Sequence, residues 1–447
     1  MSDEIKEHSP ADESRGYLLN ILSHKEKRHH LAQAIGPGIL MAGAAIGGSH
    51  LVSSTQAGAR YGWSLLGLLL LVNLFKYPFF LYCQRYAAAT GESVLHGFKR
   101  MGKAYILAYF LLNIVNGFLN ITGVAMVTAS LSMNFGIDGA GWSLSTLCVG
   151  FVAVCALIVI VGRYRALDRI AKTVILILAI STIIAVLAAA FQYQPAPTGA
   201  APSSPWTWSA FGFIILFMGW MPAPIDIAVW PSLWTPARER ETGHKVNIKE
   251  AMIDFHIGYI GTVFLALCFL ALGAMVLQGS DQDFASLTGS EFAAQLIGMY
   301  TEAIGPWAHG LIAVAAFTTM FSTTLTCVDA YPRCLATCSN LLRSTPSDSQ
   351  GTLRRWHIGW VFASLLASTI LTTFFLSDLM SMIKVAMVIS FLTSPFFAWM
   401  HTRIILQEWV PASAQPGKAM RALSGLGMAF FVILTLAYIY WKWIAGE

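Results

Sequence analysis

The sequence predicts an all-α membrane protein that crosses the bilayer about eleven times. Three observations support this prediction. Of the 447 residues, 56% are hydrophobic and only 11% are charged, whereas soluble domains carry roughly 25% charged residues. Apolar runs long enough to cross ~30 Å of hydrocarbon recur along the whole chain. The segments between these runs are alternately rich and poor in lysine and arginine.

Residues 1–30 are expected to form a cytoplasmic tail, because they are polar and charged and lack the apolar segment of a signal peptide. The predicted spans follow in order. They cover residues 31–59, 64–90, 104–134, 142–162, 170–192, 207–235, 252–277, 305–340, 357–377, 379–402 and 420–444.

Basic residues predict the orientation of these spans. They gather after every second span, for example at Arg85, Lys99 and Arg100 after the second, whereas 192–205 and 278–305 are nearly free of them. The positive-inside rule therefore places the N-terminus in the cytoplasm and the C-terminus outside, in what we expect to be a bacterial inner membrane. The formal charge of +5 then reflects topology, and no nucleic-acid partner is expected.

The seven cysteines contain no CxxC pair, which argues against a disulfide framework and against a zinc site. The spans also lack HExxH, GxSxG and paired acidic motifs. We therefore expect neither an enzyme nor a protein with a resident cofactor.

Two spans are interrupted at comparable places. The first contains Gly-Gly-Ser-His at 47–50, where each glycine costs roughly 1 kcal/mol in a helix, and the sixth contains Met-Pro-Ala-Pro at 221–224, where each proline removes an amide donor. Paired breaks of this kind are typical of inverted-repeat transporters, with the binding site between the half-helices. The alternative is a pair of ordinary helix kinks.

The chain resembles the Nramp family of divalent-metal transporters in several segments. The matching segments are Gly36-Pro37, residues 58–62 (Gly-Ala-Arg-Tyr-Gly), Asn73-Leu74 and Met221-Pro222. The resemblance implies a LeuT-type fold of two inverted five-helix repeats. These would occupy 31–192 and 207–402, with 420–444 as an additional eleventh span.

The functional residues of that family are largely replaced. Its span 1 reads Asp-Pro-Gly-Asn, so Gly47 takes the place of the metal-ligating carboxylate and His50 that of the ligating amide. Met221 is retained in span 6, but Ala223 stands at the histidine that follows. The two proton-accepting carboxylates of span 3 correspond to Gly117 and Asn120.

A site without carboxylates is expected to bind a bare divalent ion poorly. A half-helix that starts at residues 48–50 presents unpaired amides and a positive dipole end instead. We therefore predict that a small anion, for example bicarbonate, or a neutral solute binds there, and His50 could change its charge near neutral pH. The predicted binding residues are Gly47, Gly48, Ser49, His50, Met221, Pro222 and Ala223.

Two lysines lie within predicted spans, Lys76 in span 2 and Lys384 in span 10. Charges at membrane depth usually face a cavity or each other. Two buried cations would favour an anionic substrate. Alternatively, Lys76 pairs with Asp226 or Asp329, and Lys384 reaches the interface or Asp378. Trp220 and Trp230 flank the break of span 6 and are candidates to line the pathway.

Several alternatives remain open from the sequence. The resemblance implies that hydroxyls of span 8 and carbonyls of span 1 could hold a coupling sodium ion, with Ala45, Thr319, Ser322 and Thr323 as candidates. A rival hypothesis keeps Mg²⁺ or Mn²⁺ as the substrate, bound by His50, Met221 and Asp226. A second rival is a non-transporting membrane sensor. The oligomeric state is left open.

Overall fold

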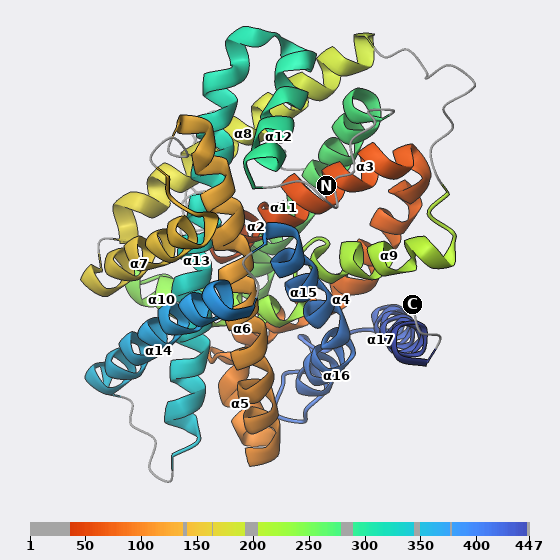
Figure 1. The fold of residues 1–447 in the computed structure, drawn as a ribbon. Coiled ribbons are helices and arrows are strands. Elements are labelled where there is room, and N and C mark those ends of the chain that lie inside the picture. Colours follow the sequence, from red (N-terminus) through yellow and green to blue (C-terminus); the bar gives the residue numbers. More distant parts are fainter. Residues whose placement is uncertain are drawn as a thin grey trace, which may run out of the picture.

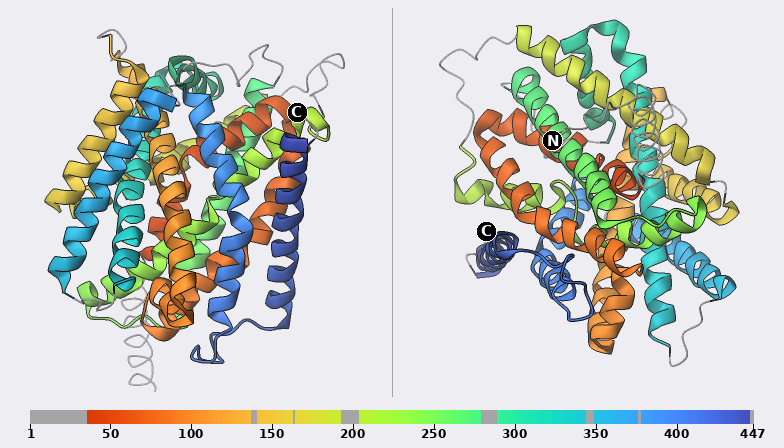
Figure 2. Two further views of the ribbon diagram at one scale, coloured as in Figure 1. Left: turned by 60° about the horizontal axis from the view of Figure 1, so that its bottom comes forward. Right: turned by 180° about the vertical axis from the view of Figure 1, so that it is seen from behind.

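The computed structural model describes residues 36–136, 141–162, 164–192, 204–278, 289–343, 349–375 and 378–444. The predicted tail at 1–30 lies outside this set. In the described residues the regular secondary structure is entirely helical (Figure 1). The long helices run side by side through the molecule (Figure 2).

The first half of the chain forms α2 to α8. Their bounds are α2 Pro37–Ala45, η1 Ser49–Ser54, α3 Thr55–Tyr61, α4 Leu66–Thr90, α5 Val94–Met101, α6 Lys103–Ser132, α7 Leu144–Val161 and α8 Tyr164–Gln192.

The second half forms α9 to α17. Their bounds are α9 Trp208–Trp220, η5 Ile225–Val229, α10 Trp230–Thr242, α11 Ile248–Leu272, η6 Gly273–Leu277, α12 Gly289–Ile304, α13 His309–Leu341, α14 Gln350–Ile370, α15 Leu379–Leu392, α16 Ser394–Ile405 and α17 Lys418–Ile439.

Every predicted span coincides with a helix or with a broken helix. Within the described residues, eight helices are long and apolar enough to cross a membrane, and nine if the bent pair α15 and α16 forms one span. The two remaining predicted spans correspond to the broken first helix, α2 to α3, and to α8, whose apolar part is Leu176–Phe191. The sequence did not predict the two shorter helices α5 and α12.

The centre of the molecule is built from α2, α6, α9, α11, α13 and α15. Helix α6 packs along α13, α11 packs on α2 and α4, and α15 lies between α6 and α9. Helices α2 and α11 pack so closely that a Cβ on Gly258 would lie 2.4 Å from the Gly38 carbonyl oxygen. These central helices hold the two breaks in contact with one another.

A buried carboxylate fixes the start of the first span. Asp254 on α11 accepts hydrogen bonds from the Gly36 amide (3.1 Å) and from the Gly38 amide (2.6 Å), and also from the Gln84 side chain (3.2 Å). The first amides of a helix have no partner inside the helix, and a negative charge is favourable there. Asp254 therefore acts as an N-terminal cap that a distant helix supplies to α2.

Helices α7, α14 and α17 lie at the periphery and present large apolar side chains outward, among them Leu157 (62% exposed), Leu366 (61%) and Ile433 (63%). Helix α17 stands at one edge of the bundle (Figures 1 and 2). Exposed apolar surface on this scale requires a lipid environment.

The loops that the sequence predicts to be cytoplasmic meet at one end of the bundle. Arg85 donates to the Ser413 carbonyl (2.8 Å), and Arg100 lies over the Trp409 ring, 5.4 Å from its centroid. Arg333 and Arg354 line a cavity of about 500 Å³ together with residues 91–93 and His96 of α5. Basic residues that follow spans 2 and 8 thus lie on the same side as the segment that follows span 10, as the alternation of charge predicts.

Candidate functional site

The glycine pair breaks the first span at the centre of the bundle. Helix α2 ends at Ala45, and the chain resumes as η1 at Ser49. A Cβ on Gly48 would lie 2.4 Å from the Trp220 ring, and one on Gly47 would lie 2.9 Å from the Thr323 methyl group. Glycine is therefore required here for close packing as well as for the break.

The proline pair breaks the sixth span beside it. Helix α9 ends at Trp220, Met221 is extended, and a short 3₁₀ turn starts at Ile225. Pro222 has no amide hydrogen to donate to the carbonyl of Met218, four residues earlier. The Ser49 hydroxyl lies 2.7 Å from the Ala45 carbonyl oxygen and 3.1 Å from that of Pro222, so it bridges the two breaks.

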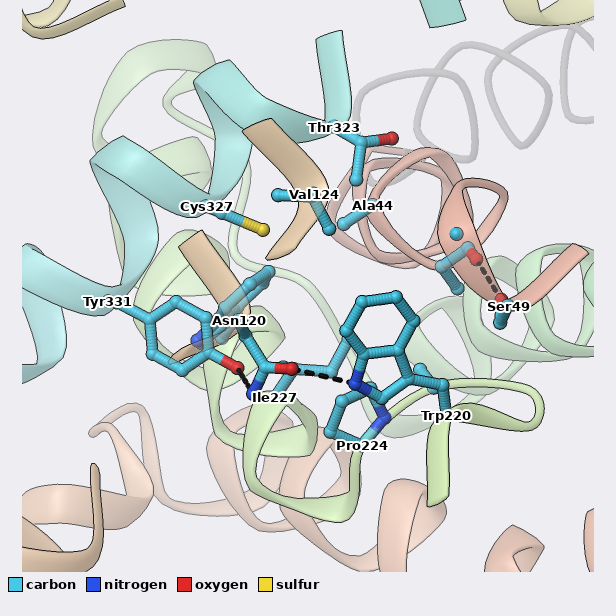
Figure 3. Close-up of a pocket in the computed structure, with 14 residues that line it drawn as sticks. Ala44, Ser49, Asn120, Val124, Trp220, Pro224, Ile227, Thr323, Cys327 and Tyr331 are labelled. Carbon is cyan, nitrogen blue, oxygen red and sulfur yellow. Dashed lines mark hydrogen bonds between the residues drawn. The ribbon is translucent and has the colours of Figure 1, made fainter. Parts of the chain in front are cut away.

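A small cavity of about 30 Å³ lies between the breaks. A buried water needs ~10–15 Å³ of such space, so about two waters would fit. Figure 3 shows the side chains that converge on it. The lining residues are Ala44, Ala45, Gly48, Ser49, Asn120, Val124, Trp220, Ala223, Pro224, Ile227, Trp230, Thr323, Cys327 and Tyr331.

Asn120 is the polar centre of this cavity. Its Oδ1 accepts a hydrogen bond from the Trp220 indole (2.7 Å), and its Nδ2 donates to the Tyr331 hydroxyl (3.1 Å) and to Ser390 Oγ (3.2 Å). Figure 3 shows the first two of these bonds. Asn120 thereby joins α6 to α9, α13 and α15, and the cavity wall is neutral on this side.

Gly117 lies one turn earlier on α6 and makes room for Tyr331. A Cβ at Gly117 would lie 3.0 Å from the Tyr331 ring. Both positions where the resembled family carries acids are therefore adapted to the same tyrosine. Asn120 bonds its hydroxyl, and Gly117 accommodates its ring.

His50 does not line the cavity, in contrast to the prediction. Its Nε2 lies 2.8 Å from the Thr262 carbonyl oxygen, and its Nδ1 lies 2.7 Å from Ser49 Oγ. Because a carbonyl oxygen only accepts, Nε2 carries a hydrogen. His50 is fully buried and ties the first span to α11, which removes it from the set of side chains that can face a solute.

The amides at the break are also less available than predicted. The amides of His50 and Leu51 both donate to the Gly47 carbonyl, at 3.1 and 2.9 Å. The prediction that the His50 amide is unpaired is therefore wrong. Within the break, some main-chain amides are therefore already hydrogen-bonded to a main-chain carbonyl.

Of the three binding residues predicted at the break of span 6, only Ala223 lines the cavity. Met221 is fully buried outside the lining, and Pro222 contributes its carbonyl to Ser49. Trp220 and Trp230, the candidates to line the pathway, both line this cavity. The sequence reasoning missed Tyr331, Cys327 and Ser390, and the only available signal was that Tyr331 and Cys327 share the face of α13 that also carries Thr323.

Lys76 is fully buried and hydrogen-bonded to the break of span 6. Its ammonium donates to the carbonyl oxygens of Met218 (2.8 Å), Gly219 (2.9 Å) and Ala223 (2.9 Å). Asp226 on η5 is close enough to act on Lys76 electrostatically. The predicted pairing with Asp226 is thus electrostatic, and the direct contacts of Lys76 are main-chain carbonyls.

Two other charged residues of the predicted set lie away from the cavity lining. Asp329 does not pair with Lys76, because its carboxylate bonds Arg333 (2.5 Å) and lies 3.4 Å from His357, near the basic end. Lys384 is exposed on α15 and therefore is not a second buried cation. Its electrostatic neighbour is Asp378, as the interfacial alternative predicted.

The hydroxyls proposed for sodium lie where α13 meets α2. Thr323 Oγ1 lies 3.3 Å from the Gly43 carbonyl oxygen, and Thr319 Oγ1 is buried without a hydrogen-bond partner. The Ala45 carbonyl accepts from Ser49 instead. Ser322 is buried beside them but is absent from the cavity lining.

Comparison with known proteins identifies the family. The model of the natural resistance-associated macrophage protein-like (Nramp) family matches residues 38–441. The chain belongs to the Nramp family. An uncharacterized protein of Pasteurella multocida (strain Pm70) is 39% identical over 419 residues, which are 93% of this chain and 94% of that protein.

Solved structures show the LeuT-type fold of this Nramp protein. A variant of the Eremococcus coleocola manganese transporter superposes with a TM-score of 0.67 at 13% identity, over 92% of this chain and 87% of that one. MhsT in complex with L-phenylalanine gives a TM-score of 0.58 at 14% identity, over 90% and 98%. Mhp1, a nucleobase-cation-symport-1 family transporter, gives 0.55 at 15% identity, over 92% and 93%.

Proposed function

We propose that this Nramp protein is a secondary transporter of a small anion, such as bicarbonate, or of a small neutral polar solute. We place it in the inner membrane of a bacterium, with its N-terminus in the cytoplasm and its C-terminus outside. The observation that carries the proposal is the chemistry of the cavity between the breaks. Its lining offers hydroxyl, amide, indole and thiol groups, and none of the lining residues is charged.

The polar groups of the lining suit a solute that both accepts and donates hydrogen bonds. Ser49, Thr323 and Tyr331 carry hydroxyls, and Asn120 carries an amide. Trp220 and Trp230 close the cavity with aromatic surface. The small volume supports a solute of a few atoms over an amino acid or a nucleobase.

The metal hypothesis finds less support in the arrangement of its candidate ligands. His50, Met221 and Asp226 are all absent from the cavity lining. Within the part of the chain that the structure describes, no group of three or more His, Cys, Asp or Glu side chains is placed to hold a metal ion. A dehydrated divalent cation would therefore meet no compensating charge in this cavity.

Sodium coupling is part of the proposal. A buried hydroxyl without a partner at Thr319 carries a desolvation cost of about 1–3 kcal/mol, and an ion between it and the carbonyls of α2 would remove that cost. We expect uptake to depend on sodium in the wild type. Uptake by Thr319→Val, which keeps the shape and loses the oxygen, should be at least several-fold less sensitive to sodium.

Uptake into proteoliposomes separates the hypotheses. Labelled bicarbonate at alkaline pH, nitrate, formate and urea are offered in parallel with Mn²⁺, to the wild type and to Ser49→Ala, His50→Ala and Asp226→Asn. Gly261→Ala is the matched control, since a Cβ there meets nothing within 4 Å. We expect uptake of an anion or neutral solute that Ser49→Ala reduces several-fold.

Two results would contradict this proposal. Uptake of Mn²⁺ that is lost in His50→Ala and in Asp226→Asn would support the metal hypothesis. Binding of a solute without its accumulation, in vesicles that hold an ion gradient, would support the sensor hypothesis instead.

A further inference from the structure

The break of span 6 creates a set of carbonyl oxygens that need a positive partner. Met218 and Gly219 belong to the last turn of α9, whose carbonyls have no intrahelical amide to bond. In a continuous helix, the amide of residue 222 would donate a hydrogen bond to the Met218 carbonyl. Residue 222 is a proline, which has no amide hydrogen. The negative end of the α9 dipole adds to the demand for a cation at this place.

Lys76 meets this demand from another helix. Its ammonium has three hydrogens and three carbonyl oxygens lie at 2.8, 2.9 and 2.9 Å. Two come from the end of α9 and one from Ala223, within the break. One group on α4 therefore joins the end of α9 to the interrupted segment.

The charge of this ammonium is balanced by Asp226. The two residues are 0% and 1% exposed and act on each other electrostatically. Neither oxygen of Asp226 has a hydrogen-bond partner of normal geometry. A buried carboxylate without such partners is costly unless a positive charge is near.

We propose that Lys76 is a tethered cation that takes the place of an inorganic ion at the break of span 6. It satisfies the carbonyls that a free cation would otherwise coordinate, and it remains in the protein throughout transport. The cation site at this break is therefore permanently occupied, whichever solute the cavity carries. Removing the side chain should open a site for a small organic ammonium ion.

The structure specifies a suitable probe. Lys76→Ala removes three carbons and the ammonium, which together have the size and shape of propylammonium. The thermal unfolding midpoint of the purified full chain is measured with increasing propylammonium chloride, and with choline chloride as the bulky ionic control. Lys76→Met fills the same space without charge and is the matched variant.

We expect propylammonium to raise the midpoint of Lys76→Ala by several degrees in a saturable way, and to leave the wild type and Lys76→Met unchanged. Recovery of folded Lys76→Ala only when propylammonium is present during purification would have the same meaning. A stable Lys76→Ala protein that does not respond to propylammonium would overturn the proposal.

A second variant tests the proposal without relying on that substitution. Lys76→Met/Asp226→Asn removes both charges and nearly conserves volume. Because its three carbonyls lose their donor, its midpoint should lie below that of the wild type by several degrees. A double variant as stable as the wild type would overturn the assignment, since the ammonium would then contribute nothing. Both measurements are independent of uptake, so they can fail or succeed separately from the proposed function.

Discussion

The contact between Gly48 and Trp220 leads to the sharpest prediction. In Gly48→Ala the new Cβ would lie 2.4 Å from Cζ3 of the indole, well inside van der Waals contact. The ring must move, and the hydrogen bond from its nitrogen to Asn120 is strained or lost. The substitution should therefore change both stability and the shape of the cavity.

The magnitude follows from two terms. Overpacking of a close-packed interior costs about 1–3 kcal/mol, and loss of a buried hydrogen bond costs about 0.5–1.5 kcal/mol. The gain in helix propensity from alanine is at most ~1 kcal/mol and is small at a break. We expect Gly48→Ala to lower the free energy of unfolding by about 2–3 kcal/mol.

The assay is a double-mutant cycle by equilibrium unfolding in mixed micelles, with uptake measured alongside. Trp220→Phe removes the ring atoms that clash, so Gly48→Ala should cost clearly less in that background, with a coupling of at least 1 kcal/mol. Gly261→Ala serves as the control. If the destabilisation by Gly48→Ala and by Trp220→Phe is additive, or if Gly48→Ala leaves stability and uptake unchanged, this contact does not shape the cavity wall.

Two further predictions concern the carboxylate that caps span 1 and the amide that replaced one in span 3. Asp254→Ala leaves two buried amides at the start of α2 without an acceptor, so it should destabilise the protein by about 2 kcal/mol in equilibrium unfolding. Asp254→Asn keeps one acceptor and should cost less stability. Equal costs for the two variants would contradict the capping role. Asn120→Asp keeps the bonds that Trp220, Tyr331 and Ser390 can donate but places a negative charge at the cavity. At a separation of roughly 5 Å between the new carboxylate and an anion in the cavity, and an effective dielectric of ~20, the repulsion is about 3 kcal/mol. Anion uptake should therefore fall at least tenfold while the protein stays folded. Unchanged uptake would contradict the proposed path of the solute.

The sequence predicted the fold well because the bilayer imposes strong rules. In lipid, the backbone amides and carbonyls must hydrogen-bond within the protein, which permits only helices or closed barrels. The length of the apolar runs and the charge of the loops between them were therefore enough to place the spans. The two breaks were also correctly located, since glycine and proline act through the local backbone. Helices α5 and α12 were missed because they are too short to give the signal of a span.

The side chains of the site were less predictable, because their direction depends on neighbours that are distant in sequence. His50 follows Ser49 directly, yet it turns to the Thr262 carbonyl while Ser49 faces the cavity. The partners of Lys76 are carbonyls, which no residue type reveals. Tyr331 lies more than 200 residues from Asn120, and only the packing of α6 on α13 brings them together.

The two breaks share one physical requirement. Polar main-chain groups at membrane depth must find partners inside the protein, and in this structure Ser49 and Lys76 supply them at the first and the sixth span. A motion that separates the half-helices must change the contacts that the single Ser49 hydroxyl makes with the carbonyl oxygens of Ala45 and Pro222. The three bonds of Lys76 join the end of α9 to Ala223 within the interruption, and we expect them to persist while the half-helices of span 6 move as a unit. Hydrogen exchange should therefore protect the amides around residues 218–227 more strongly in the wild type than in Lys76→Met/Asp226→Asn, and equal protection would show that Lys76 does not hold the two halves together.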